Sequence, residues 1–334
     1  MRELTADNAA EYLREKGWIG DEPAAVEALG GGVSNLVLRV ETPTQRFILK
    51  QSRPRLRTRD AWFSDVARIF REQETMEALA PLLPGVVPAL LHSDRDNYVF
   101  AMSHAPRGAA VWKARLLAGI VELERGEEAG RILGRIHEAS ASDPARFERF
   151  AERTAFEQLR IEPYYVRIQE RHPEVAAAVV PLVERMQSAR EALCHGDFSP
   201  KNLLADAGGF TLVDYETAHF GDPAMDLGFF LSHLLLKTVK RFDERERYFE
   251  LTRAFWRGYA AQLHYTDVSA LVRRAIPHLG VCLLVRIDGT SPVDYLPEEP
   301  KREAVRRLGR GLLRDGVRRW DEVVELTASS AGGS

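Results

Sequence analysis

Residues 193–226 decide the fold, and they read LCHGDFSPKNLLADAGGFTLVDYETAHFGDPAMD. The first part holds His195 and Asp197 with one residue between them, and Asn202 follows five residues after Asp197. The second part holds Asp214 at the end of a β-prone run. A lone His-x-Asp is usually accidental. The added Asn, an intervening turn and a further Asp make this pattern specific, and it indicates a catalytic loop.

The turn between the two parts sets the spacing of the polar groups. Residues 206–209 (DAGG) are a turn signal between β-prone runs, which predicts a hairpin. Asn202 and Asp214 each lie six residues from Gly208, so a turn centred there would place their Cβ atoms roughly 4.5–5.5 Å apart. An amide oxygen and a carboxylate at that separation can share Mg²⁺. Asp197 is then free to orient an attacking hydroxyl and accept its proton. Phosphoryl transfer needs both functions, a metal that neutralises phosphate charge and a carboxylate that positions the hydroxyl.

The composition is that of a globular protein. The chain has 334 residues, of which 45% are hydrophobic and 28% charged. A net charge of −3 argues against nucleic-acid binding, and two cysteines are too few for a disulfide framework or a zinc site. The N-terminus lacks an apolar signal core, and the longest apolar stretch, residues 227–236, is too short to span a bilayer. We expect a cytoplasmic protein with no membrane or nucleic-acid partner.

The order of elements predicts a small β-rich part before a helical part. Strands are expected within 25–40, 46–51, 86–92 and 97–103, with helices at 5–16 and 64–83. From Ala105 the pattern becomes helical, except for a short β segment over 192–214. These patterns predict an α+β chain with an N-lobe over 1–104, a C-lobe over 105–326 and a disordered tail over 327–334.

A glycine run and a lysine-bearing strand indicate where an anion could bind. The run 30–35 (GGGVSN) lies between β-prone segments, and such a turn brings backbone N–H groups close to an anion. Lys50 follows three apolar residues; it is either an ordinary strand-end charge or the partner of a helix carboxylate. Glu72, on the inward stripe of the 64–83 helix, is the best partner, and Glu74 is the runner-up.

The motifs HGDFSPKN and LVDYE together resemble the aminoglycoside phosphotransferase and choline kinase superfamily. The resemblance implies a bilobal protein-kinase-like fold with a small antiparallel sheet and one main helix in the N-lobe, and ATP and Mg²⁺ as cofactors. It implies that Asp197 is the catalytic base and that Asn202 and Asp214 bind the metal. His195 and Asp226 would brace the catalytic loop.

The same resemblance implies a nucleotide site in the N-lobe, with a glycine loop over the phosphates and a hinge against the adenine. The residues it implies are Gly31, Gly32, Ser34, Asn35, Lys50, Glu72, Ser103 and Ala105.

Within the superfamily, the pattern is most similar to 5-methylthioribose kinases. The similarity rests on Lys50-Gln51, Trp62, Arg68, Glu72 and the segment LVRIDG at 284–289. The chain differs from that family at Asn202 and at Val285, where a second arginine would stand. The candidate acceptor-binding residues are Glu216, His219, Asp222 and Arg286, with Tyr164, Tyr165 and Trp256 as pocket walls or as plain core residues.

The sequence therefore predicts an ATP- and Mg²⁺-dependent phosphotransferase acting on a hydroxyl of a small metabolite, such as a methylthioribose-like sugar. An aminoglycoside or amino-alcohol (choline-type) phosphotransferase is the first alternative. A catalytically silent nucleotide-binding protein is the alternative from another class, and the complete set of Lys50, Asp197, Asn202 and Asp214 argues against it. The acceptor and the oligomeric state stay open, a homodimer included.

Overall fold

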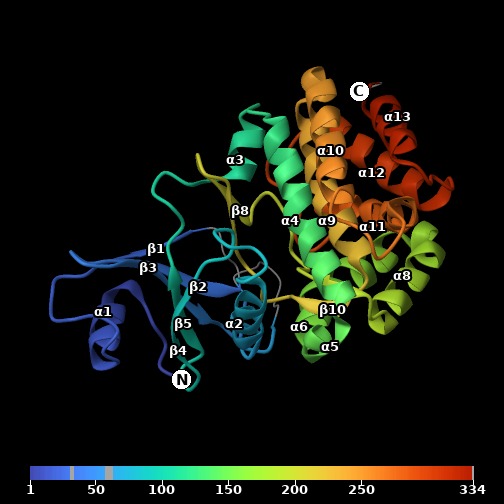
Figure 1. Cartoon of the computed structure of the whole chain (residues 1–334). Helices are drawn as coiled ribbons and strands as arrows, with labels where there is room; N and C mark the ends of the chain where they lie inside the picture. Colours follow the sequence, from blue (N-terminus) through green and yellow to red (C-terminus); the bar gives the residue numbers. More distant parts are fainter. Residues whose placement is uncertain (31–33, 57–62, 333–334) are drawn as a thin grey trace. The chain divides into compact units, whose positions relative to one another are not determined.

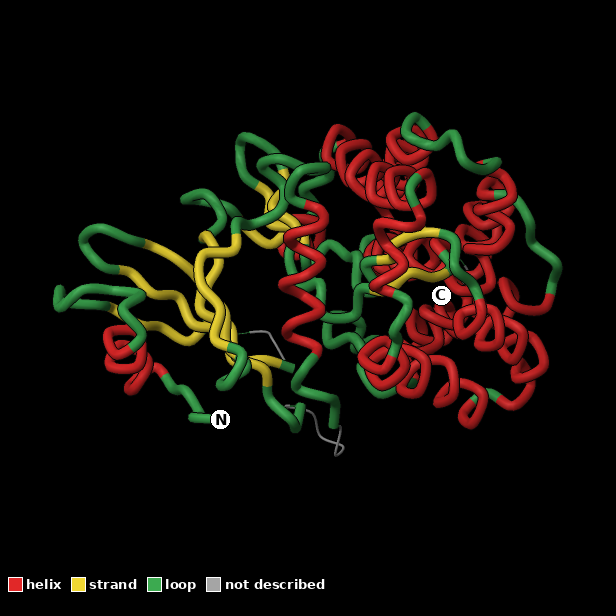
Figure 2. Tube along the Cα trace, turned by 60° about the horizontal axis from the view of Figure 1, so that its bottom comes forward, coloured by secondary structure: helices red, strands yellow, loops and turns green. Residues whose placement is uncertain are grey.

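The computed structural model describes residues 1–30, 34–56 and 63–332. The chain folds into two compact units. The N-terminal unit comprises Met1–Ala109 and Thr211–Thr217, and the C-terminal unit comprises Ala110–Phe210 and Ala218–Ser334. The first is built on a β-sheet and the second is mostly helical (Figures 1 and 2). The predicted α+β class is confirmed.

The N-terminal unit is an antiparallel five-stranded sheet with the strand order β1-β2-β3-β5-β4. In its centre, β2 and β3 pair along their whole length, with Leu38 opposite Leu49. The strands are β1 (Ala25–Ala28), β2 (Asn35–Glu41), β3 (Arg46–Ser52), β4 (Leu90–Asp94) and β5 (Val99–Ser103).

Each face of this sheet packs against a helix because side chains alternate along a strand. Leu38, Val40 and Leu49 share one hydrophobic cluster with residues of α1 (Ala6–Glu15). The next residue, Lys50, therefore points to the opposite face, where α2 (Arg68–Leu79) packs against β3 and β4. The buried Lys50 side chain therefore faces α2.

A short segment far along the chain completes the N-terminal unit. The Leu212 N–H donates to the Val86 carbonyl at 2.9 Å, and the Tyr215 hydroxyl donates to the Leu212 carbonyl at 2.8 Å. Asp214 is thus fixed to the N-terminal unit, whereas Asp197 and Asn202 belong to the C-terminal unit.

The C-terminal unit is a helical bundle with short strands. Its long helices are α4 (Leu123–Ser142), α8 (Ala176–Ser188), α9 (Pro223–Lys240), α10 (Arg245–Ala260), α11 (Val268–Asp288), α12 (Glu299–Arg314) and α13 (Trp320–Ala331). The short helices are α3 (Trp112–Leu117), α5 (Pro144–Phe147), η1 (Glu148–Phe150), α6 (Thr154–Phe156), the π-helix η2 (Glu157–Val166), α7 (Arg167–Arg171), η3 (Pro173–Val175) and η4 (Phe242–Glu244). The strands are β6 (Ala110–Val111), β7 (Ala192–Cys194), β8 (Leu203–Ala205), β9 (Phe210–Leu212), which leads into the N-terminal unit, and β10 (His219–Gly221).

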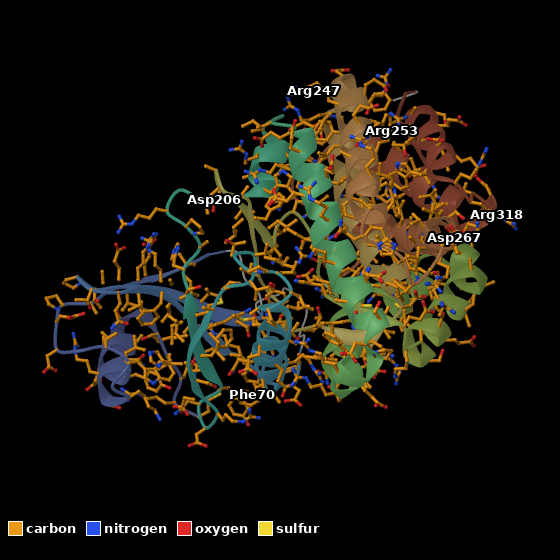
Figure 3. All side chains as sticks on the ribbon, in the orientation of Figure 1. Phe70, Asp206, Arg247, Arg253, Asp267 and Arg318 are labelled. Carbon is orange, nitrogen blue, oxygen red and sulfur yellow. The ribbon has the colours of Figure 1, made fainter. Side chains whose placement is uncertain are left out.

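The catalytic loop lies between β7 and β8. β7 pairs with β10, and β8 pairs with β6. The predicted turn after β8 forms, because the Asp206 N–H donates to the Gly209 carbonyl at 3.0 Å; Asp206 is labelled in Figure 3. These pairings hold both ends of the loop.

The centre of the bundle is α9, which is buried almost throughout, as expected for a helix that is apolar on every side. Helix α11 is long and apolar enough to span a membrane by length and composition, but more than half of that window is buried in the bundle. It packs against α9 and α12, so it serves as a core helix.

Two differences from the sequence expectation concern boundaries. The predicted lobe boundary was at Ala105, whereas the N-terminal unit runs to Ala109 and also includes the later segment Thr211–Thr217. Disorder was predicted from Thr327, but α13 continues to Ala331 there, with Val323, Thr327 and Ala331 buried along one side. Periodic burial of small residues at this spacing stabilises the last turns of the helix.

Helices α4 and α10 approach closely because glycines line their contact. A Cβ at Gly130 of α4 would collide with the Phe255 carbonyl oxygen, and one at Gly258 of α10 would collide with the Glu127 carbonyl oxygen. Neither obstacle is the flexible end of a side chain, so the backbones themselves would have to separate. This close crossing brings His137 of α4 next to Tyr259 of α10, whose hydroxyl lies 2.8 Å from His137 Nδ1.

We predict that Gly258→Ala destabilises the protein by about 1–3 kcal/mol, the usual range for overpacking. The expected sign is informative, because the same change in an exposed helix would stabilise it by up to about 1 kcal/mol. Arg257→Ala, at the adjacent exposed position, is the control and should change stability by no more than about 0.5 kcal/mol. Urea unfolding of the three proteins measures the difference, and a more stable Gly258→Ala protein would contradict the packing described.

Candidate active site

A buried carboxylate, Asp226, organises the start of the catalytic loop. Asp226, in the first turn of α9, is fully buried. Its oxygens accept hydrogen bonds from the backbone N–H groups of His195 (2.6 Å) and Gly196 (2.8 Å). Burial alone would raise the pKa of Asp226, but hydrogen bonding and the charges of His137 and His195 offset this, and the pKa is lowered. The carboxylate therefore stays ionised and fixes the loop's backbone.

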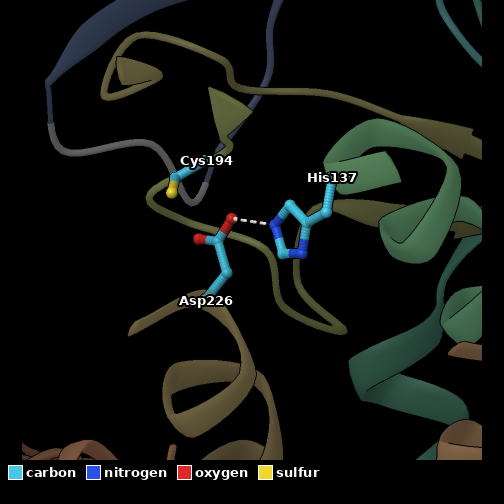
Figure 4. Close-up of side chains that lie close together, drawn as sticks. All are labelled: His137, Cys194 and Asp226. Carbon is cyan, nitrogen blue, oxygen red and sulfur yellow. Dashed lines mark hydrogen bonds and ion pairs between the residues drawn. The ribbon is translucent and has the colours of Figure 1, made fainter. Parts of the chain in front are cut away.

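The third partner of Asp226 was missed in the sequence. His137 Nε2 lies 3.3 Å from Asp226 Oδ2 (Figure 4). Nothing in the sequence around His137 points to a residue 89 positions away. With Nδ1 next to the Tyr259 hydroxyl, both ring nitrogens are engaged. His137 is thus a second support for the brace that His195 and Asp226 were expected to form.

The same three side chains could be mistaken for a metal site. One ligand atom from each of His137, Cys194 and Asp226 lies within 4.8 Å of the others (Figure 4). However, the histidine and the carboxylate already satisfy each other and their neighbours, and burial raises the pKa of the Cys194 thiol well above its usual value. A protonated thiol is a poor metal ligand, so the cluster is a hydrogen-bonded brace.

Asp197 is held from three directions at the mouth of the loop. Its Oδ1 lies 2.8 Å from Arg160 Nη2, and its Oδ2 accepts from Asn202 Nδ2 at 2.8 Å. The Asp197 N–H donates to His195 Nδ1 at 3.2 Å. The carboxylate keeps 15% of its side-chain surface exposed, so a ligand can reach it. This is the geometry expected of a group that positions a hydroxyl.

Arg160 is the main residue that sequence reasoning missed. It lies in η2, a π-helix interrupted by Pro163, and its Nε also donates to the Gly196 carbonyl at 2.7 Å. π-Helices are rare and recur at functional sites. The side chain is almost buried, so it holds both the loop backbone and the Asp197 carboxylate. No motif in the sequence marks a lone arginine 37 residues before its partner.

Asn202 is oriented as a metal ligand should be. Its amide nitrogen donates to the Asp197 carbonyl (2.9 Å) and carboxylate (2.8 Å), which leaves the amide oxygen for another partner. Hard divalent cations prefer such oxygens. The second predicted ligand, Asp214, has a φ of 73°, which is rare for a residue other than glycine. Since the two residues belong to different units, their pairing stays a prediction.

In the N-terminal unit, Lys50 contacts two carboxylates. Its Nζ lies 2.6 Å from Glu72 Oε2 and 2.7 Å from Asp214 Oδ1. Burial alone would lower the pKa of Lys50, but the Asp214 and Glu72 carboxylates more than offset it, so the pKa is raised and the lysine stays charged. Glu74, the runner-up, instead lies 3.9 Å from Arg71 and is partly exposed.

Glu216 was predicted to bind the acceptor, but its contacts are with the end of the glycine run. Its carboxylate accepts hydrogen bonds from the Ser34 hydroxyl, the Asn35 amide (2.8 Å) and Arg68 Nε (3.0 Å). All four residues belong to the N-terminal unit and are buried. The predicted nucleotide residues Gly31 and Gly32, and Trp62 of the methylthioribose kinase pattern, lie outside the described residues.

The predicted hinge groups follow β5. The Ser103 N–H already donates to the Ala89 carbonyl at 2.8 Å, and the Ser103 hydroxyl accepts from the Ala89 N–H at 2.9 Å. The Ala105 carbonyl lies 2.6 Å from His104 Nδ1. The binding of adenine by Ser103 and Ala105 therefore stays a prediction. The groups left to make the hydrogen bonds are the Ser103 carbonyl and the Ala105 N–H.

Two other predicted acceptor residues, His219 and Asp222, are buried and contact other side chains of the protein. His219 is buried in β10 and stacks on Phe156 with ring centroids 3.7 Å apart. Asp222 caps α9 by accepting from the Ala224 N–H at 3.1 Å, and it also pairs with Arg185 and Arg274. Neither side chain is free to bind a substrate in this arrangement, because both are almost completely buried.

Arg286 alone among the four predicted acceptor residues is partly exposed, and its guanidinium lies 3.0 Å from the Ser291 carbonyl and 3.1 Å from His233 Nε2. Its guanidinium lies 5.8 Å from the Tyr164 ring centroid and 5.9 Å from that of Phe229. Arg160 lies 5.5 Å and 5.4 Å from the same two centroids. Arg286 thus packs on the same two rings as the residue that holds Asp197.

Comparison with known proteins identifies the family. The model of the phosphotransferase enzyme family matches residues 25–261. The chain belongs to this family. A methylthioribose kinase of Exiguobacterium sibiricum is 24% identical in an alignment of 285 positions that covers 77% of this chain and 73% of that protein. One of Yersinia pseudotuberculosis is 25% identical in an alignment of 374 positions that covers 93% of this chain and 92% of that protein. The chain is a small-molecule kinase.

Solved structures support the fold. A choline/ethanolamine kinase family protein of Mesorhizobium loti is similar with a TM-score of 0.53 at 17% identity, over 98% of this chain and 100% of that one. A spectinomycin phosphotransferase is similar with a TM-score of 0.51 at 10% identity, over 98% and 99%. At these identities the likeness concerns the fold alone, and the predicted protein-kinase-like fold is confirmed.

We predict that Asp226→Asn lowers both activity and stability. An amide is neutral and offers one acceptor atom, so both backbone N–H groups would lose a charged partner and one of them would lose its acceptor, at a cost of about 1.5–3 kcal/mol. Asp243→Asn, at an exposed position, is the control. Thermal unfolding and ATP turnover of both variants measure the effect.

The pH dependence of unfolding checks the cause. Since the pKa of Asp226 is lowered in the folded protein, its contribution to stability is present above the unfolded value of about 3.9 and is lost as the pH falls below it. Stability of the Asp226→Asn protein should therefore fall less steeply between about pH 5 and pH 3 than that of the wild type. Equal slopes would contradict the role of this carboxylate.

We predict that Arg160→Gln reduces kcat about 10- to 100-fold, the effect of one charged hydrogen bond, with the KM for ATP little changed. Asp197 would keep its bond to Asn202 but lose the group that fixes its second oxygen. Arg167→Gln, with a half-exposed guanidinium seven residues on, is the control. Steady-state kinetics with ATP and an accepted substrate test this, and an unchanged kcat would remove Arg160 from the site.

Proposed function

We propose that this kinase uses ATP and Mg²⁺ and transfers the γ-phosphoryl group to a hydroxyl of a small metabolite, with Asp197 as the catalytic base. The observation that supports the proposal best is the fixed geometry of Asp197. Arg160 and Asn202 hold one carboxylate oxygen each, and the backbone of the loop is anchored by Asp226. A carboxylate held this way orients a hydroxyl and accepts its proton in the transition state.

The residues that would hold the metal have a suitable donor set. Asn202 offers its amide oxygen because its nitrogen is engaged, and Asp214 offers a carboxylate already partnered with one cation, Lys50. Mg²⁺ bound there would neutralise phosphate charge during transfer. Lys50, held by Glu72, would bind the nucleotide phosphates. A silent nucleotide-binding protein would not need Asp197 held in place.

A methylthioribose-like sugar is the acceptor that the relatives favour. The curated relatives are named methylthioribose kinase, and one of them aligns over 93% of this chain. An aminoglycoside or an amino alcohol would need anionic groups to bind its cationic nitrogens. The predicted acceptor region instead contains Arg286. We propose a cytoplasmic enzyme.

We predict that Asp197→Asn lowers kcat by about 10²–10⁴-fold while ATP binding is retained. The assay is ADP release from MgATP with methylthioribose, related pentoses, choline, ethanolamine, homoserine and kanamycin. Asp96→Asn, exposed and in the N-terminal unit, is the control. Turnover on one compound that the Asp197 variant loses would support the proposal. Unchanged turnover in that variant would remove Asp197 from its role.

A further inference from the structure

Four cationic side chains of the C-terminal unit gather beside the catalytic loop without carboxylate partners. They are Lys113, Lys201, Lys237 and Arg286. Arg286 Nη2 lies 3.1 Å from His233 Nε2, and Lys237 Nζ lies 2.8 Å from the His233 carbonyl. Burial lowers the pKa of His233 well below its usual value, and all four cations lower it further. Within residues 1–30, 34–56 and 63–332, none of the four forms an ion pair with a carboxylate. The exposed Asp294 carboxylate acts on Lys113, but against four cations it leaves the cluster with a surplus of positive charge.

Lys237 is the fully buried member of the cluster, and its burial costs folding free energy. It is fully buried in α9, and its Nζ donates to the His233 carbonyl at 2.8 Å. Burial lowers its pKa well below the usual value, and Lys113 and Arg286 lower it further. A buried ammonium without a counter-ion costs free energy. Methionine would occupy the same volume without that cost, so the lysine is not explained by stability.

Two polar atoms in the cluster have no partner. The Tyr295 hydroxyl and Arg286 Nε are buried and form no hydrogen bond with any described residue. The Tyr295 ring centroid lies 5.3 Å from Lys113 Nζ and 5.5 Å from Lys237 Nζ. Buried polar groups are normally paired, and these donors, next to surplus cations, are the groups that an oxyanion would satisfy.

The cluster is connected to the catalytic loop within the same unit. The Lys113 N–H donates to the Pro200 carbonyl at 2.8 Å, two residues before Asn202. On its other side, Arg286 and Arg160 pack on the same two rings, Tyr164 and Phe229. The proposed anion site and the Asp197–Arg160 pair therefore share two neighbouring rings.

Resting on the proposed kinase activity, but in place of the neutral methylthioribose-like sugar that the relatives favour, we propose that the phosphate acceptor carries an oxyanionic group, a carboxylate or a phosphate, bound by Lys113, Lys237, Arg286 and Tyr295. Lys113 and Arg286 are partly exposed and make the direct contacts. Lys237 lies beneath them, where a bound anion would offset the lowering of its pKa and favour its charged form, and the acceptor hydroxyl faces Asp197. This arrangement excludes acceptors whose recognised end is cationic, because they would meet like charges.

Direct binding tests the cluster without requiring turnover. Inorganic phosphate and glycerate are titrated calorimetrically into the Asp197→Asn protein, without nucleotide or magnesium, and into the same protein carrying Lys113→Met or Arg286→Gln. We expect at least one probe to bind and each cluster change to weaken it about tenfold, the loss of one charge-assisted hydrogen bond. Lys240→Met on the same helix as Lys237, whose lysine already pairs with Glu298, should bind unchanged. Absence of binding, or equal binding by all variants, would overturn the inference.

Turnover separates this inference from the proposed function. The wild type is assayed with MgATP and matched acceptors, namely glycerol, glycerate, glycerol 3-phosphate, ribose and ribose 5-phosphate. We expect the anionic members to have a higher kcat/KM, and Lys113→Met to raise their KM without changing the KM for ATP. Preference for neutral members, or a raised KM for ATP alone, would overturn the inference and leave the kinase proposal standing. Anion binding without turnover on any acceptor would instead count against the kinase proposal alone.

Stability distinguishes a binding role of Lys237 from a structural one. Lys237→Met should unfold at the same or a higher temperature than the wild type, because a buried unpaired cation is removed. The same variant should bind phosphate or glycerate about tenfold more weakly. A less stable protein with unchanged anion binding would show that Lys237 is structural and would overturn its place in the site.

Discussion

The hydrogen bonds from the His195 and Gly196 amides to the buried Asp226 carboxylate are the constraint on which the rest of the site depends. They join the core helix α9 to the catalytic loop. Asp226 is itself held by His137, which is in place because α4 and α10 cross at glycines. The packing of α4 against α10 therefore fixes His137, and through Asp226 it fixes the backbone of the catalytic loop. Side chains that leave this backbone, above all Asp197, take their direction from it.

In the proposed reaction, each unit would supply different groups. The C-terminal unit supplies the carboxylate that would accept a proton, together with its holders Arg160 and Asn202. The N-terminal unit supplies the Lys50–Glu72 pair and Asp214, which the segment Thr211–Thr217 carries back to it. A phosphoryl-transfer enzyme needs positioned charges more than covalent chemistry. Each unit presents such charges already held by buried partners.

Motif-bearing residues could be found from the sequence, but their supports could not. The spacing of His195, Asp197, Asn202 and Asp214 identified the loop, and the period of the 64–83 helix selected Glu72 over Glu74. Arg160 was missed because its role depends on a π-helix, which no periodicity predicts.

Glu216, His219 and Asp222 were assigned to the acceptor because they follow the metal segment, yet tertiary packing buries each of them. Lys237 directly follows the apolar run 227–236 and gave no signal in the sequence, since only the packing shows that this side chain is buried.

The most direct test of phosphoryl transfer to a hydroxyl is phosphorus NMR of the reaction of the protein with MgATP and an acceptor from the panel. The account predicts a new phosphomonoester signal in step with ADP formation, and its loss in the Asp197→Asn protein. Release of inorganic phosphate alone, or an equal ester signal in that variant, would contradict it.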